Sequence, residues 1–258
     1  MFEEDLKVMR DYSLGFVTTT PGGGYPAYGG KGRYRDTIKV SNAGIEGKGE
    51  LDYITSTTYT RNSLFFLDSM NAVADTFLIR PQLSGTEYPP AQALVASVHW
   101  EPYNDVMFIN NTKENPFDLF DVHASHRGFL ALRPSGLEGG GRTDFENAQT
   151  TASLYRFDHH RIYSDRLNFK VRLNAESPWA FGLDNARGDI DFAQRRGEFT
   201  LRDPAFALHV IENQYDVYMD HAVWDMDAKT FDLNQMTSGR PAYMVSTREA
   251  QDSLNYTA

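Results

Sequence analysis

The phrase Gly49-Glu-Leu-Asp-Tyr53 returns along the chain as Gly141-Arg-Thr-Asp-Phe145 and as Gly188-Asp-Ile-Asp-Phe192. A degenerate copy, Ala96-Ser-Val-His-Trp100, lies between the first two. The aromatic residues that close the four copies are 47, 45 and 47 positions apart. Self-similarity at a nearly fixed step is typical of stacked structural units, so we predict a repetitive fold with units of about 46 residues.

The repetition is also visible when the chain is shifted by 92 residues without gaps. This shift places Gly44-Ile-Glu-Gly-Lys-Gly49 on Gly136-Leu-Glu-Gly-Gly-Gly141. Farther along, apolar residues match in three pairs, namely Phe65 with Phe157, Phe77 with Phe169, and Ile79 with Val171. Matches that persist this far in register favour a repeated unit over a chance abundance of glycine and aromatic residues.

Each residue type in the recurrent phrase has a structural role that its chemistry supports. Glycine permits a positive φ or a close backbone approach at a corner. Aspartate can accept hydrogen bonds from backbone N–H groups of a turn. The aromatic residue is then free to pack on its counterpart in the next unit. We therefore interpret the aspartates as structural and expect the aromatic residues to be buried at equivalent corners; these residues are Asp52, Asp144 and Asp191, with Tyr53, Phe145 and Phe192.

Alternation of apolar and polar residues predicts many short strands, most clearly in Leu167-Asn-Phe-Lys-Val-Arg-Leu173. Helical turns are expected in short segments only, at 2–9, 68–74 and 115–120. The fold class is therefore all-β. The repeated step favours a β-solenoid or stacked-sheet architecture, and the alternative is a β-sandwich or jelly roll with internal duplication.

Composition divides the chain into three parts. Residues 1–30 form an N-terminal segment with a Gly-rich connector, 31–235 the β-repeat domain, and 236–258 a C-terminal segment. Both ends would suit a segment of a longer chain. The hydrophobic content of 41% and aromatic content of 13% indicate a folded protein.

Charge and cysteine content exclude several kinds of function. The formal net charge of −10 argues against nucleic acid as a partner, because phosphate binding requires a basic surface. It also disfavours docking on anionic lipid. Without cysteine the chain has no thiolate nucleophile and no Cys-ligated zinc site. No stretch approaches the roughly 18 apolar residues of a membrane-spanning helix, so membrane insertion is not expected.

Motifs of known catalytic or cofactor chemistry are absent from the sequence, so no catalytic residue is assigned and no cofactor is expected. Gly29-Gly30-Lys31-Gly32 has neither the spacing nor the following Ser/Thr of a phosphate loop. The best metal candidates are Asp121, His123 and His126, because a His-x-x-His pair beside a carboxylate can bind a divalent ion where a turn brings the rings together. The alternative is that these are solvated loop histidines.

Two further groups of residues are candidates for binding. An acidic run could hold calcium, although its spacing also fits an amphipathic sheet edge. It consists of Asp216, Asp220, His221, Asp225 and Asp227. Aromatic side chains could stack on sugar rings, although in alternating strands they are more often part of a core. They are Trp100, Tyr103, Trp179, Tyr215 and Trp224.

The Gly-Leu-x-Gly-x-Gly motif at 136–141, the strand-rich repeats, the acidity, the lack of cysteine and Asn213-Gln-Tyr215 together resemble β-repeat regions of large bacterial envelope or secreted proteins. The resemblance implies an extracytoplasmic, non-enzymatic scaffold that associates with itself or with neighbouring repeats of a longer chain. The alternative is a carbohydrate-active enzyme or a carbohydrate-binding module, with a glycan as ligand. That alternative rests on analogy of fold.

Overall fold

Alternating apolar and polar residues form strands with one face toward a core, and strands make up most of the structure. A computed structural model describes residues 2, 7–10, 13–17, 23–121, 124–201, 203 and 206–248. The fold is all-β, with 65% of the chain in strands of one large antiparallel sheet, which confirms the predicted class. Within the described residues the only helical element is a single 3-10 turn, η1 (Pro102–Asn104).

The chain divides into two compact units, and each is described here by itself. Unit 1 comprises Met1–Thr143 and Leu154–His160, and unit 2 comprises Asp144–Ser153 and Arg161–Ala258. The division falls inside the stretch 31–235 that the sequence treats as a single repeat domain.

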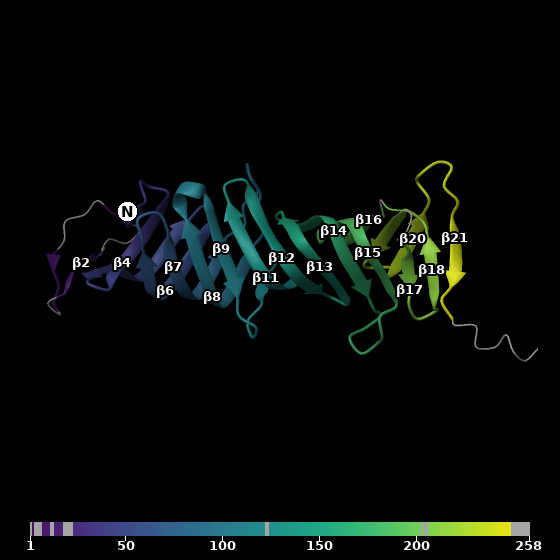
Figure 1. Cartoon of the computed structure of the whole chain (residues 1–258), viewed down its shortest axis with the longest axis horizontal. Helices are drawn as coiled ribbons and strands as arrows, with labels where there is room; N and C mark the ends of the chain where they lie inside the picture. Colours follow the sequence, from purple (N-terminus) through teal and green to yellow (C-terminus); the bar gives the residue numbers. More distant parts are fainter. Residues whose placement is uncertain are drawn as a thin grey trace, which may run out of the picture. The chain divides into compact units, whose positions relative to one another are not determined.

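Unit 1 is built from strands that are mostly hairpin-connected. They are β1 (Lys7–Val8), β2 (Leu14–Val17), β3 (Tyr25–Ala27), β4 (Gly32–Ser41), β5 (Gly44–Tyr53), β6 (Ser56–Phe65), β7 (Met70–Ile79), β8 (Ala91–Glu101), β9 (Val106–Asn111), β10 (Phe117–Leu119) and β11 (Ala124–Arg133). Each strand from β4 to β8 pairs antiparallel with the next one along the chain, and Figure 1 shows β6, β7, β8 and β9 side by side. Farther along, β9 and β10 both pair with β8 and β11, so the two short strands together occupy one position in the sheet.

The sheet of unit 1 curls so that strands which are not neighbours meet across its inner face. Tyr53 at the end of β5 and Trp100 near the end of β8 have ring centroids 5.2 Å apart, although β6 and β7 separate these strands in the sheet. Tyr28 also packs edge-on against Trp100 at 5.2 Å. All three side chains are at most 3% exposed, so the core of this unit lies inside the curl.

Unit 2 has the same kind of core. Its strands are β14 (Arg161–Val171), β15 (Phe181–Asp191), β16 (Arg196–Thr200), β17 (Leu208–Val210), β18 (Tyr215–Tyr218), β19 (His221–Asp225), β20 (Thr230–Asn234) and β21 (Tyr243–Ser246), and β12 (Gly136–Phe145) and β13 (Ala148–Phe157) contribute residues to both units. Phe145 of β12 packs edge-on against Phe192 at 5.2 Å. Trp224 of β19 contacts Phe169 of β14 at 5.2 Å, again across strands that are not neighbours.

The recurrent phrase of the sequence ends strands at turns in both units. Tyr53 and Phe145 are the last residues of β5 and β12, and each is followed by a residue with positive φ, Ile54 at 55° and Glu146 at 48°. Tyr53 and Phe145 are each 3% exposed, whereas Phe192 is half-buried. The contacts of Tyr53 with Trp100 and of Phe145 with Phe192 bring together aromatic residues from successive copies, as predicted.

The aspartates of the recurrent phrase each accept hydrogen bonds from residues nearby in the sequence, but their donors differ. Asp191 accepts hydrogen bonds of 2.9 Å from two backbone N–H groups of the turn that follows, as predicted. Asp52 instead accepts from the hydroxyl of Thr57 at 2.7 Å, and Asp144 accepts from the side-chain amide of Gln149 at 2.9 Å. Those two aspartates therefore tie one strand of a hairpin to the other.

Strand boundaries coincide after the 92-residue shift. The ranges of β4, β5 and β6 fall on those of β11, β12 and β13. The backbone corresponds in detail as well, because Gly49 and Gly141 adopt φ of 154° and 132°. A Cβ atom at either position would lie 2.0 to 2.1 Å from the carbonyl oxygen of Arg35 or Arg127 on the adjacent strand, which explains glycine at both.

The short helical turns expected from the sequence are wrong where the structure describes them. Lys7 and Val8 form β1, Met70 begins β7, and Phe117–Leu119 is β10. In each case the apolar residues pack into, or pair along, the sheet. Tertiary pairing therefore overrides a helical spacing that extends over only two or three residues.

Candidate interaction edge

The sheet of unit 2 divides into two arms beyond β15. Residues 187–191 of β15 pair with β16, which continues through β19 to β20. Residues 181–183 of the same strand pair with β17, which continues through β18 to β21. In the described part of the chain, β20 and β21 each pair on one side only, so both arms end in an edge strand.

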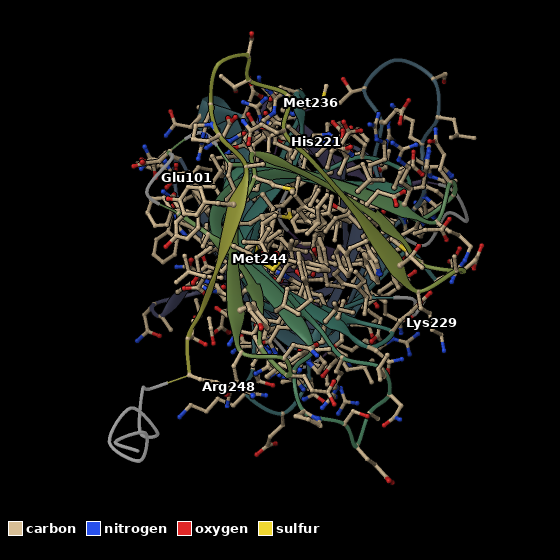
Figure 2. The ribbon with its side chains drawn as sticks, turned by 90° about the vertical axis from the view of Figure 1, so that its right-hand side faces the viewer. Glu101, His221, Lys229, Met236, Met244 and Arg248 are labelled. Carbon is tan, nitrogen blue, oxygen red and sulfur yellow. The ribbon has the colours of Figure 1, made fainter. Side chains whose placement is uncertain are left out.

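Figure 2 shows unit 2 from this end. β21, with Met244 and Arg248, lies on one side, and the segment from Lys229 to Met236, which contains β20, lies on the other.

β21 is unusually apolar for an exposed edge. Tyr243, Met244 and Val245 are 50%, 61% and 49% exposed. Tyr243 stacks on Tyr218 of the paired strand, with ring centroids 4.5 Å apart and planes at 15°. An edge strand carries backbone N–H and C=O groups without a partner, and natural proteins usually protect such edges with charge, proline or bulges. None of the four residues of β21 is charged or a proline, so the strand is a template for pairing.

The hydrogen-bonding direction of β21 follows from its register. Beyond the strand, the N–H of Thr247 donates to the carbonyl of Gln214 at 2.8 Å. Because hydrogen-bonding residues alternate along an antiparallel pair, the N–H groups of Met244 and Ser246 point away from β18. These two donors face the open side of the strand.

Asp220 fixes the connection between the two arms. This residue lies between β18 and β19 and is 3% exposed. Its carboxylate accepts hydrogen bonds from the N–H groups of Met236 at 2.7 Å and Thr237 at 2.9 Å, and from the side-chain amide of Gln235 at 3.0 Å. Burial alone would raise the pKa of Asp220, but these hydrogen bonds to the charged form outweigh it and lower the pKa below its ordinary value. The segment that leads from β20 to β21 is therefore held by one ionised carboxylate.

Replacing Asp220 by asparagine is expected to lower the free energy of unfolding of unit 2 by about 2 kcal/mol at pH 7, because the amide cannot accept all three bonds. Because the folded state lowers the pKa of Asp220, this contribution is complete above the ordinary carboxyl pKa of 3.8 and is lost as the pH falls below it. Urea unfolding at pH 7 and at pH 3 measures both effects. Asp232→Asn, which removes the same charge from an exposed position of β20, is the control. Equal losses in the two variants would contradict the role of Asp220.

Of the three residues predicted to bind a metal, two lie in the described part of the chain. Asp121 is exposed in a turn, His123 lies outside the described residues, and His126 is fully buried in unit 1. The two ring nitrogens of His126 lie 2.9 Å from the hydroxyl of Thr143 and 3.3 Å from the carbonyl of Phe129. Its imidazole is therefore engaged inside the core. Among the described residues, no group of three histidine or acidic side chains is arranged to hold a metal ion, and the metal site stays a prediction.

The acidic run of unit 2 takes part in local contacts. Asp216 lies 2.7 Å from Nδ1 of His209, and Asp227 lies 2.5 Å from Nε of Arg195. Asp225 accepts hydrogen bonds from two N–H groups of the turn that follows β19. Together with the bonds of Asp220, these contacts give each aspartate of the run a structural partner.

The candidate sugar-binding aromatics fall into three groups. Trp100 and Trp224 belong to the cores of units 1 and 2. Trp179 is half-buried, with the guanidinium of Arg172 5.0 Å from its ring centroid. Tyr103 and Tyr215 are 56% and 40% exposed, but they belong to different units.

β21 lies within residues 236–258, which were predicted to form a separate C-terminal segment and not a strand of the sheet. A signal was present, since the β-favouring run Tyr243-Met-Val245 follows the turn-forming residues Gly239-Arg-Pro241. Asp220 was identified only as part of the acidic run, and its bonds to residues 235–237 depend on the pairing of the arms.

Comparison of the chain with protein-family models, with curated proteins and with solved structures finds no match in any of the three. The fold itself defines the class: an all-β protein with one large antiparallel sheet. Across the residues that the structure describes, no helix has the length and apolar character to cross a membrane.

Proposed function

We propose that this protein is a non-enzymatic structural and interaction module of a larger surface or secreted protein, outside the cytoplasm. It binds by adding an extended strand to β21, and the partner strand comes from a second copy or from a neighbouring repeat of a longer chain. The observation that carries the proposal is the exposed, uncharged strand Tyr243–Ser246, with its two outward N–H groups. Strand addition at a sheet edge gains main-chain hydrogen bonds and selects partners through alternate side chains.

The 92-residue correspondence supports a repetitive architecture of stacked sheet units. Strand boundaries, the positive-φ glycines and the aromatic contacts all recur at this interval or at 47 residues. Each curled unit buries its own aromatic core, but the last strand of the sheet, β21, still pairs on one side only among the described residues. A strand of a further unit could pair with that free side, as expected of a module in a repetitive protein.

The first edges of unit 1 are less suited to pairing than β21. β3 contains Pro26, which has no N–H to donate, and β1 has two residues. We therefore expect association through β21 rather than through the edges of β1 or β3.

Met244→Pro is expected to abolish self-association and leave the fold intact, because it removes an N–H that points away from β18. Met244→Ala keeps that N–H and is the matched control. Sedimentation velocity over a wide range of protein concentration measures the mass, and circular dichroism reports folding. The wild type and Met244→Ala should form oligomers, while Met244→Pro should stay monomeric. Identical mass distributions for all three would refute strand addition between copies.

The carbohydrate alternative predicts a different result. A glycan-array screen with and without calcium should give specific signals for a carbohydrate-binding module and none for a scaffold. Glycan-array signals that disappear in the Tyr103→Ala or the Tyr215→Ala variant would favour a carbohydrate-binding module over a scaffold.

A further inference from the structure

A groove lies over the first strands of unit 1. Its volume is about 1130 Å³, and its lining residues come from β1, β2, β4, β5 and β6 and from Met9 and Arg10 beyond β1. This volume is slightly above the range of about 300–1,000 Å³ that is usual for sites of small molecules. The lining residues of the groove belong to unit 1, whereas β21 belongs to unit 2.

The charge of the groove is opposite to that of the chain. Five cations line it, Lys7, Arg10, Lys39, Lys48 and Arg61, against one carboxylate, Glu46. The whole chain carries a formal charge of −10, so this concentration of positive charge is local. A cleft lined by one sign of charge focuses the field and raises the local concentration of the opposite ion.

Three of these cations have no partner among the residues that the structure describes. Lys7, Arg10 and Lys48 are exposed and form no ion pair there. Arg61 lies 3.2 Å from Asp75, but both side chains are more than half exposed, so this pair is weak. The cationic side of the groove is therefore available to an anion.

The same groove is also lined by apolar side chains. Val8 and Val17 are 69% and 39% exposed, and Met9 and Phe16 lie beside them in the lining. The glycine at position 15 leaves room for Met9, since a Cβ there would lie 2.8 Å from the Met9 sulfur. Apolar and cationic surfaces thus share one hollow.

We propose that this groove binds one molecule of an anionic amphiphile, a carboxylate or phosphate head on an alkyl chain. The head lies among Lys7, Arg10 and Lys48, and the chain lies on Val8, Met9 and Val17. Cations alone would accept any anion, and an apolar surface alone would accept any hydrocarbon. Their combination selects a ligand that carries both.

Calorimetric titration of the whole chain with dodecyl phosphate, below its micellar concentration, tests the proposal. We expect dodecyl phosphate to bind at least about tenfold more tightly than inorganic phosphate, because burial of even two methylene groups gives a factor of this size. Dodecyltrimethylammonium, which has the same chain and the opposite charge, should bind at least about tenfold more weakly. Equal affinity for all three would overturn the proposal.

Variants separate the two parts of the site. The triple variant Lys7→Gln, Arg10→Gln, Lys48→Gln should weaken dodecyl phosphate binding at least about tenfold. The control Lys31→Gln, Lys113→Gln, Lys229→Gln removes the same number of charges outside the groove and should leave affinity unchanged. Val8→Ser, at an exposed position, should weaken dodecyl phosphate without changing the binding of inorganic phosphate.

A membrane surface is the competing source of anionic heads. Vesicles of phosphatidylglycerol are the probe for it, with protein binding followed by co-sedimentation. Binding to vesicles without binding to monomeric dodecyl phosphate would overturn the single-molecule site. The single-molecule site would also be overturned if the control triple variant lost as much affinity for dodecyl phosphate as the groove triple variant.

Discussion

Replacing Trp100 by alanine is expected to lower the free energy of unfolding of unit 1 by about 3–5 kcal/mol, the usual cost of removing a large buried aromatic side chain. Trp100 is fully buried and contacts Tyr53 and Tyr28 at 5.2 Å each. Its ring joins β8 to β5 across the inner face of the curl, so its removal leaves a cavity where non-neighbouring strands meet. Because a domain is stable by only about 5–15 kcal/mol, this one change removes a large share of the total.

Urea unfolding followed by far-ultraviolet circular dichroism measures the effect. Tyr103→Ala is the control, because Tyr103 is 56% exposed although it also packs near Tyr28. We expect that control to cost less than about 1 kcal/mol. Trp100→Phe, which keeps a ring at this position, should recover part of the loss. A loss of similar size in Trp100→Ala and Tyr103→Ala would mean that the curl does not depend on Trp100.

Acid is expected to destabilise unit 1 between pH 6.5 and pH 4 through His126. Burial lowers the pKa of His126 to about 4, and hydrogen bonds to the carbonyls of Phe129 and Gly140 counter this only in part. The ring packs against Phe117, Tyr155 and Phe157. In the unfolded chain the same imidazole has its ordinary pKa of 6.5, so the unfolded state binds the proton first.

The sign and size of the effect follow from this difference. Stability falls as the pH drops below 6.5 and stops falling, for this group, near pH 4, with a total of about 3 kcal/mol. His126→Gln does not titrate, so its stability should change less over this range than that of the wild type. Hydrogen exchange of the β11 amides at several pH values is the measurement, because it reports on unit 1. The control is His99→Gln, at a side chain that is 40% exposed. Parallel pH profiles for wild type and His126→Gln would contradict the prediction.

The recurrent phrase shows how much of the fold was predictable. The copies that end in Tyr53 and Phe145 gave the strand ends and the aromatic contacts, because glycine, aspartate and an aromatic residue each act within a few residues of a turn. The hydrogen bonds of Asp52 and Asp144 were not predictable in the same way. Their partners, Thr57 and Gln149, depend on which residues of a hairpin face each other, and one step in register changes that.

Features that depend on distant pairing could not be predicted. The arms that end in β20 and β21 arise because two short strands share one edge of β15, and a local pattern does not specify this arrangement. The groove could not be predicted for the same reason. Four of its cationic residues lie on four different strands, and the fifth, Arg10, follows β1. The burial of His126 was not predicted either, because it depends on which face of β11 is turned toward the core.

The chain of hairpins from β4 to β8 has a consequence for how the protein is made. Each of these strands pairs with the one that follows it, so each pairing closes a loop within a single hairpin. Closing a shorter loop costs less entropy than closing a longer one. We therefore expect unit 1 to acquire its sheet strand by strand as the polypeptide is synthesised. A hairpin that has formed can then serve as the template for the next strand to emerge.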